Sequence, residues 1–222
     1  MHPTIALRQA MDRCGLIAIL RGVTPVEATG IGHALYDAGF RIIEVPLNSP
    51  QPLDSIRALR DELPRDCLVG AGTVINEAAC AAVAAAGGNI VVMPHSDPAV
   101  IRAAKSAGMA CAPGVATLTE AYAALAAGAD VLKLFPAEAL SPSVLKAWRA
   151  VLKPPVSLVP VGGIVPASVE PYAAAGASGF GLGSALYRPG DTAAQVATQA
   201  TAFIQAWQQA YPCARPHDNP SR

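Results

Sequence analysis

The chain has 222 residues, of which 52% are hydrophobic and 14% are charged, with sixteen basic and sixteen acidic residues. This length allows a single domain with a large buried core. The balanced charge excludes the electrostatic footprint expected of a protein that binds nucleic acid or an anionic membrane surface. No apolar run approaches the roughly 18 residues of a membrane helix, and the N-terminus lacks the pattern of a signal peptide, so we expect a cytoplasmic protein. The five cysteines contain no C-x-x-C pair, and their odd number argues against a disulfide framework.

A helical pattern over residues 4–13 opens the chain, and strand-like and helix-like segments then alternate. The expected strands are 16–22, 41–47, 67–73, 89–94, 109–114, 131–136, 157–163 and 179–186. The expected helices are 25–38, 50–63, 76–86, 98–107, 117–127, 143–152, 166–175 and 192–209. Many of these helices begin with Pro, Ser, Thr or Asn and end with Ala-Gly, which is the usual asymmetry of helix ends.

Eight strand–helix units in succession predict a parallel sheet. Eight is the number at which such a sheet closes, so we expect an α/β fold of the (β/α)₈ TIM barrel type. It would form a single domain over residues 1–211 with an N-terminal helix, followed by a disordered tail over residues 212–222. An open doubly wound sheet is the alternative, but residues 21–25 lack the G-x-G-x-x-G that normally follows its first strand.

One lysine lies inside an expected strand. Lys133 stands in the run Val-Leu-Lys-Leu-Phe-Pro at residues 131–136, whereas the other three lysines fall in helical or loop segments. Burial of an unpaired ammonium group depresses its pKa and produces a free amine that can attack a carbonyl. The alternative is a structural lysine at a strand end whose amine extends to water.

Glu44 is the only acidic residue inside an apolar strand. Arg21, Glu44, Thr73 and Lys133 lie toward the carboxyl ends of their strands, where the active site of such a barrel lies. If the strand faces that carry them point inward, the four side chains converge on one mouth. For the third strand, this requires that the face carrying Val69 and Thr73 points inward. Glu44 then either forms a structural ion pair with Lys133 or Arg21, or acts as a general acid and base beside an amine nucleophile.

The remaining polar strand ends allow two interpretations each. Arg21 could bind a carboxylate bidentately or satisfy backbone carbonyls at a strand end, and Thr73 could contact a ligand or cap a helix. Glycine-rich segments close the seventh strand, at Gly162 and Gly163, and the eighth, at Gly181-Leu182-Gly183-Ser184. Backbone N–H groups at these two positions commonly bind phosphate in such barrels, so we predict a phosphate site there.

Metal binding is not expected from this sequence. The four histidines are scattered and form no H-x-x-x-H pair, and no carboxylate cluster stands at the strand ends. His95 follows the fourth strand and could line the mouth of the barrel, although a solvated loop histidine is the simpler interpretation.

Six segments together resemble one enzyme family over residues 16–211. They are 19–22 (Ile-Leu-Arg-Gly), 44–50 (Glu-Val-Pro-Leu-Asn-Ser-Pro), 70–74 (Gly-Ala-Gly-Thr-Val), 132–136 (Leu-Lys-Leu-Phe-Pro), 161–163 (Val-Gly-Gly) and 181–187 (Gly-Leu-Gly-Ser-Ala-Leu-Tyr). The sequence resembles the keto-deoxy-phospho-sugar-acid aldolases, class I enzymes that cleave 2-dehydro-3-deoxy-6-phosphogluconate or its galactonate epimer. The resemblance implies a homotrimer that needs no metal or other cofactor, and whose partners are a phosphorylated keto-sugar acid and pyruvate.

The resemblance also implies a role for each predicted site residue. Lys133 would form the Schiff base and Glu44 would be the acid and base. Arg21 and Thr73 would hold the pyruvate half of the substrate. The phosphate would be held by the glycine-rich ends at Gly162, Gly163, Gly183 and Ser184.

Two positions distinguish the branches of this family. The gluconate branch usually carries an arginine where this chain has Asn48, and a threonine where it has Val161. The resemblance therefore favours the galactonate substrate, with the gluconate epimer as the alternative. A phosphosugar isomerase or epimerase that uses Glu44 without a covalent lysine is an alternative outside the class, and a phosphosugar sensor without catalytic activity is another.

Overall fold

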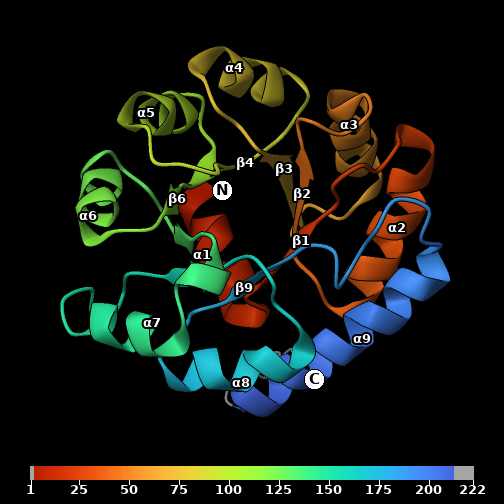
Figure 1. The fold of residues 1–222 in the computed structure, drawn as a ribbon. Coiled ribbons are helices and arrows are strands. Elements are labelled where there is room, and N and C mark those ends of the chain that lie inside the picture. Colours follow the sequence, from red (N-terminus) through yellow and green to blue (C-terminus); the bar gives the residue numbers. More distant parts are fainter. Residues whose placement is uncertain (1–2, 213–222) are drawn as a thin grey trace, which may run out of the picture.

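The structure, a computed structural model, describes residues 3–212 of the chain. Figure 1 shows the strands at the centre and helices α2 to α9 around them. The helices are α1 (Pro3–Arg13), α2 (Pro25–Ala38), α3 (Pro52–Glu62), α4 (Glu77–Ala85), α5 (Pro98–Ser106), α6 (Leu118–Ala126), α7 (Pro142–Arg149), α8 (Pro166–Ala174) and α9 (Ala193–Ala210). The strands are β1 (Leu16–Ile19), β2 (Ile42–Pro46), β3 (Leu68–Gly72), β4 (Ile90–Val92), β5 (Ala110–Ala112), β6 (Gly114–Val115), β7 (Leu132–Leu134), β8 (Leu158–Pro160) and β9 (Phe180–Leu182).

Local sequence signals explain where the helices start and stop. Five of the helices that follow α1 (α2, α3, α5, α7 and α8) carry proline in the first turn, where its missing N–H would have no intrahelical partner. The helix α2 shows both ends clearly. Glu27 accepts hydrogen bonds from the Thr24 backbone N–H at 3.1 Å and from the Thr24 hydroxyl at 2.6 Å, and Gly39 ends the helix at a φ of 117°.

The strands are parallel, as the alternation of strands and helices predicts, but they do not form a closed eight-stranded barrel. Six strands form one sheet in the order β5-β4-β3-β2-β1-β9, and three form a second sheet in the order β6-β7-β8. Between β8 and β9 the only strand-type pairing in residues 3–212 is an isolated bridge from Val161 to Gly181. The prediction of a closed (β/α)₈ TIM barrel is therefore wrong, although the predicted N-terminal helix is present as α1.

Pro113 explains where the sheet is interrupted. The sequence predicts one strand over residues 109–114, but the chain forms β5 before Pro113 and β6 after it. Proline has no backbone N–H to donate to a neighbouring strand. The β5 strand pairs with β4, whereas β6 pairs with β7, and the Pro113 carbonyl accepts from the Lys133 backbone N–H at 2.9 Å. The chain therefore leaves one sheet and enters the other at this proline.

The strands are buried on both faces, and their side chains divide between two apolar clusters. The inner cluster contains Ile17, Ile42 and Leu68, and the outer cluster lies between the strands and the surrounding helices. Val69 belongs to the outer cluster, so the prediction that its face of the third strand points inward is wrong.

Helix α1 covers the amino ends of the strands. Its residues Leu7, Ala10 and Met11 complete the inner cluster, and Figure 1 shows the helix across the centre of the helical ring. Its Arg13 and Thr4 bind Asp66 and Asp130, which precede β3 and β7. The predicted site residues lie toward the opposite, carboxyl ends of the strands.

The described part of the chain contains no helix that is both long enough and apolar enough to span a membrane. Most of the predicted tail, residues 213–222, lies outside the described residues. Pro212 is exposed at the last described position, after α9.

Candidate active site

Lys133 lies in the centre of β7 and is 7% exposed. Its neighbours in register are Gly114 on β6 and Val159 on β8. The amine nitrogen lies 4.6 Å from the centre of the Phe135 ring, where a cation would be attracted to the aromatic face. No carboxylate oxygen of residues 3–212 lies within 4 Å of this nitrogen. The alternative of a lysine that extends to water does not describe this side chain.

Glu44 lies in β2 and is 2% exposed, and its Oε2 atom has no hydrogen-bond partner in the described part of the chain. The strand β3 makes room for its carboxyl group. A Cβ atom on Gly72 would overlap Glu44 Oε2, so any other residue at this position would displace the carboxyl group. Gly72 therefore accommodates the Glu44 side chain.

Burial is the main cause of the pKa shifts of both Glu44 and Lys133. It raises the pKa of Glu44 from 4.5 to about 7, against the opposing effects of Lys133 and Arg21. Burial also lowers the pKa of Lys133; Glu44 raises this pKa, and the positive charge of Arg21 lowers it further. Desolvation therefore outweighs the attraction between the two groups. The site holds an amine that loses its proton readily beside a carboxyl group that can gain or release one near neutral pH.

Arg21 connects the loops after β1, β2 and β3. Its Nη1 atom donates to Asn48 Oδ1 at 2.6 Å, and its Nη2 atom donates to Thr73 Oγ1 at 3.5 Å. The Gly22 backbone N–H donates to the Ser49 hydroxyl at 2.9 Å, and this bond also joins the loops after β1 and β2. The guanidinium binds side chains here rather than the strand-end carbonyls considered from the sequence.

Thr73 reaches the site for a different reason than the sequence indicates. It follows β3 and has a φ of 56°, in the left-handed region, where the backbone of a residue other than glycine is strained. This turn brings Thr73 to Arg21, although Val69 and Ala71 on its predicted face point outward.

The glycine-rich strand ends meet at one pocket of about 430 Å³. Five of the eight predicted site residues line it, namely Arg21, Gly162, Gly163, Gly183 and Ser184. Gly162 has a φ of 115° and Gly163 a φ of 61°, a pair of left-handed residues that turns the chain after β8. Glu44, Lys133 and Thr73 do not line this pocket. Phe135 does, and its ring contacts the Lys133 amine, so the pocket adjoins the buried pair.

Three residues of the site were not assigned a role from the sequence. Asn48 was used only to separate the branches of the family, yet it binds Arg21 directly. Phe135 was noted only as a neighbour of Lys133 on its strand face. Arg188 lines the pocket, and its Nε atom donates to the Ser184 carbonyl at 2.9 Å. A cation four residues after the predicted phosphate loop was a usable signal for Arg188.

A cation site is not apparent in the part of the chain that the structure describes. No group of three or more His, Cys, Asp or Glu side chains there is arranged to hold a metal ion. His95, which was considered for the mouth of the barrel, is exposed, and its carbonyl accepts from the Gly114 backbone N–H at 3.2 Å.

Comparison with known proteins supports one family throughout. The model of the KDPG and KHG aldolase family matches residues 7–198. A protein of Rhizobium meliloti (strain 1021) named "Probable 2-dehydro-3-deoxy-6-phosphogalactonate aldolase" is 48% identical over 196 residues, which is 88% of this chain and 92% of the relative. The 2-dehydro-3-deoxy-6-phosphogalactonate aldolase of Escherichia coli (strain K12) is 46% identical over 202 residues, which is 91% of this chain and 98% of the relative.

A solved structure described as "Native KDPGal structure" superposes with a TM-score of 0.87. It is 45% identical in sequence, and the match covers 89% of this chain and 96% of the solved chain. The family match, the relatives and this superposition each extend over most of the described residues. The chain belongs to the KDPG and KHG aldolase family.

Proposed function

We propose that this chain is a class I aldolase that cleaves 2-dehydro-3-deoxy-6-phosphogalactonate to pyruvate and D-glyceraldehyde 3-phosphate. One observation carries the proposal: Lys133 is buried without a carboxylate partner among residues 3–212, and its pKa is lowered mainly by burial. A lysine held in this way is a nucleophile for a ketone. Glu44, with a pKa of about 7, supplies the group that moves protons during the reaction.

The first half of the reaction forms the covalent intermediate. The Lys133 amine attacks the C2 ketone of the substrate to form a carbinolamine, and loss of water leaves an iminium ion. The positive iminium nitrogen withdraws electrons from C3. This covalent electron sink makes the next bond cleavage possible at neutral pH.

The second half breaks the carbon–carbon bond. Glu44 as a carboxylate removes the proton of the C4 hydroxyl, directly or through a water molecule. The C3–C4 bond breaks, its electron pair forms the enamine of pyruvate, and glyceraldehyde 3-phosphate leaves. Glu44, now protonated, returns the proton to C3, and hydrolysis of the new iminium releases pyruvate and the free amine.

Binding of the two charged ends of the substrate orients the reacting centre. We propose that Arg21 binds the carboxylate of the pyruvate half, and Thr73, which accepts from Arg21 at 3.5 Å, supports this role. Gly162, Gly163, Gly183 and Ser184 in the adjoining pocket are proposed to hold the phosphate, through their backbone N–H groups and the Ser184 hydroxyl. These contacts lie away from the bond that breaks and would position the C4 hydroxyl near Glu44.

The galactonate epimer is favoured by the named relatives and by two side chains of this chain. Both relatives are named for the phosphogalactonate substrate. Asn48 accepts a hydrogen bond from Arg21, and Val161 lines the pocket. Assaying both C4 epimers side by side tests this choice. A higher kcat/KM for the gluconate epimer would replace the galactonate assignment without affecting the Schiff-base chemistry.

Reductive trapping tests the covalent step. Incubation with pyruvate and borohydride should irreversibly alkylate Lys133, as located by peptide mass spectrometry, and should abolish activity. Lys133→Ala should escape alkylation and lose roughly 10⁵-fold in kcat, as expected for removal of a covalent nucleophile. Lys146→Ala removes an exposed lysine from α7 and serves as the matched control.

Two results would contradict the Schiff-base assignment. Full turnover by Lys133→Ala would exclude it directly. Absence of trapping in an active enzyme would favour the alternative, an isomerase or epimerase that uses Glu44 without a covalent lysine.

The resemblance to the family also leads us to propose a homotrimer. Large apolar side chains are exposed at Val26 (91%) and Ile75 (58%), and an interface between subunits would cover such residues. Light scattering after gel filtration should give a mass close to three chains, and a monomer mass at assay concentration would contradict the proposal.

A further inference from the structure

A second cavity lies at the opposite end of the strands from the proposed active site. Its volume is about 560 Å³, within the range of small-molecule pockets. One wall is the face of α1 that carries Ala6, Ala10 and Arg13 at helical spacing. The facing wall comes from the segments that lead into β3, β4 and β5. The cavity is lined by Ala6, Gln9, Ala10, Arg13, Arg60, Arg65, Asp66, Leu68, Asn89 and Gly108.

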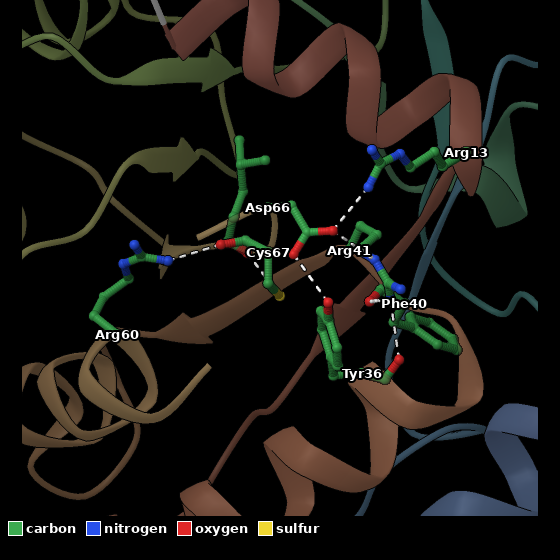
Figure 2. A network of polar contacts seen from close by, with 8 residues as sticks. Arg13, Tyr36, Phe40, Arg41, Arg60, Asp66 and Cys67 are labelled. Atoms are coloured by element: carbon green, nitrogen blue, oxygen red, sulfur yellow. Dashed lines mark hydrogen bonds and ion pairs between the residues drawn. The ribbon is translucent and has the colours of Figure 1, made fainter. Parts of the chain in front are cut away.

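The charged residues of this cavity are unbalanced toward the positive. Three arginines line it, with a single aspartate. Figure 2 shows contacts from neighbouring side chains to both carboxyl oxygens of this aspartate. Asp66 Oδ2 lies 2.8 Å from Arg13 Nη1 and 3.3 Å from Arg41 Nε, and its Oδ1 accepts from the Tyr36 hydroxyl at 3.0 Å. Asp66 is therefore neutralised by Arg13 and Arg41, and the charges of the other two lining arginines remain.

The guanidinium group of Arg60 is held in place by a backbone carbonyl. It is half-buried, and its Nη1 atom donates to the Cys67 carbonyl at 2.7 Å, as Figure 2 shows. Within residues 3–212 no carboxylate oxygen lies within 4 Å of Arg60 or of Arg65. Two guanidinium groups that line one cavity without a carboxylate partner among these residues are suited to bind a phosphate group.

The rest of the lining favours a polyol over a nucleotide. No aromatic side chain lines the cavity in the described part of the chain, so a nucleobase would find no ring to stack on. Asn89 Oδ1 accepts from the Val69 backbone N–H at 2.9 Å, which leaves its amide NH₂ group for a ligand. Gln9 adds a second amide at the other wall, and amides of this kind bind hydroxyl groups.

We propose that this cavity is a second binding site for a small phosphorylated sugar or sugar acid, with the phosphate on Arg60 and Arg65 and the hydroxyls on Asn89 and Gln9. The site is separate from the pocket at the glycine-rich strand ends, because α1 and the amino ends of the strands form its walls. The inference does not depend on the reaction that the chain catalyses.

Isothermal titration with 6-phosphogluconate tests the proposal. This probe carries the phosphate and hydroxyls but has no ketone, so it cannot form a Schiff base. The titration of the wild type should show a binding component that belongs to this cavity. Arg65→Glu should remove this component or weaken its affinity at least tenfold. The matched control is Arg102→Glu, which makes the same charge change at an exposed position on α5 and should leave that component intact. Gluconate, which lacks the phosphate, should not produce the component.

Three further comparisons keep the result specific. Lys133→Ala should retain the component, so its presence does not depend on the aldolase chemistry. The kcat and KM of Arg65→Glu for the aldolase substrate should equal those of the wild type, which separates this site from the active site. If Arg65→Glu lowers the melting temperature, the milder variant Arg65→Gln replaces it in the titration and should also weaken the component. Identical titrations of Arg65→Glu, Arg102→Glu and the wild type would overturn the proposal, and so would equal binding of gluconate.

Discussion

The two ends of the strands treat buried charge in opposite ways. At the amino end, Asp130 has a side chain only 5% exposed, and it is fully partnered. It accepts from Lys105 at 2.6 Å, from the Thr4 hydroxyl at 2.7 Å and from the Cys111 backbone N–H at 2.8 Å. At the carboxyl end, the buried Glu44 has an oxygen without any hydrogen-bond partner among the described residues.

This difference separates groups that stabilise the fold from groups that are free to react. A buried charge that is fully hydrogen-bonded holds two elements together, as Asp130 holds α1 to the segment before β7. A buried charge without partners shifts its pKa and is destabilising to keep. Glu44 and Lys133 are both of the second kind, so the carboxyl end carries reactive groups at the expense of stability.

After Lys133→Ala, the largest expected effect on catalysis is that of Glu44→Gln. The amide fills the same space above Gly72 but cannot take the proton of the C4 hydroxyl. We expect kcat to fall by roughly 10²- to 10⁴-fold, which is typical of a lost acid or base, while pyruvate is still trapped on Lys133 by borohydride. Steady-state kinetics and mass spectrometry measure the two properties. Glu170→Gln, an exposed change on α8, is the control, and a kcat of Glu44→Gln within threefold of wild type would contradict the role of this residue.

The same variant sharpens the comparison through stability. The folded state raises the Glu44 pKa from 4.5 to about 7, so the folded chain binds more protons than the unfolded chain between these pH values. The stability associated with this proton is present below pH 4.5 and is lost as the pH rises through 7. Between pH 4 and pH 8 the wild type should therefore lose up to about 3 kcal/mol relative to Glu44→Gln, at 1.4 kcal/mol per pKa unit.

Urea unfolding of both proteins at the two pH values measures this change. The difference between the two unfolding free energies should move in favour of Glu44→Gln as the pH rises. A constant difference would show that the Glu44 carboxyl has an ordinary pKa in the folded chain.

Gly72→Ala tests whether the space above β3 positions the carboxyl group. The added methyl group would overlap Glu44 Oε2 and displace it. A displacement of about 1 Å at a reacting group lowers the rate by on the order of 10²-fold, so we expect that loss in kcat. Gly30→Ala is the matched control, because nothing lies within 4 Å of a Cβ at that position in α2. Wild-type kcat in Gly72→Ala would mean that the carboxyl group moves freely.

Much of this arrangement could be predicted from the sequence. A lysine and a glutamate inside apolar strands indicated a reactive pair, because burial shifts the pKa of an unpaired ionisable group. A lysine that extends to water and a structural ion pair were the alternatives. Both are buried as expected, on β7 and β2. The alternation of strands and helices likewise predicted the parallel pairing, since apolar runs of this length separated by helical patterns have few other arrangements.

The features that could not be predicted depend on backbone geometry between distant segments. Pro113 divides one apolar run into two strands of different sheets, which periodicity does not reveal. The positive φ of Thr73 reverses the face that alternation assigns to it. The role of Gly72 becomes visible only once Glu44 on the neighbouring strand is placed over it. Each of these needs the register of two strands, and a single sequence does not state that register.

The smallest expected effect comes from the partnered end. Asp130→Asn removes the charge that pairs with Lys105 but keeps an amide that can still accept from Cys111, so we expect a loss of about 1–2 kcal/mol in unfolding free energy. The kcat should stay within twofold of wild type, because the change lies at the amino end of the strands, away from Lys133 Nζ. Asp37→Asn, an exposed change on α2, controls for the loss of one negative charge and should leave both quantities unchanged. A large loss of kcat in Asp130→Asn without loss of stability would show that the two ends are coupled, and that the division between stabilising and reactive charges does not hold.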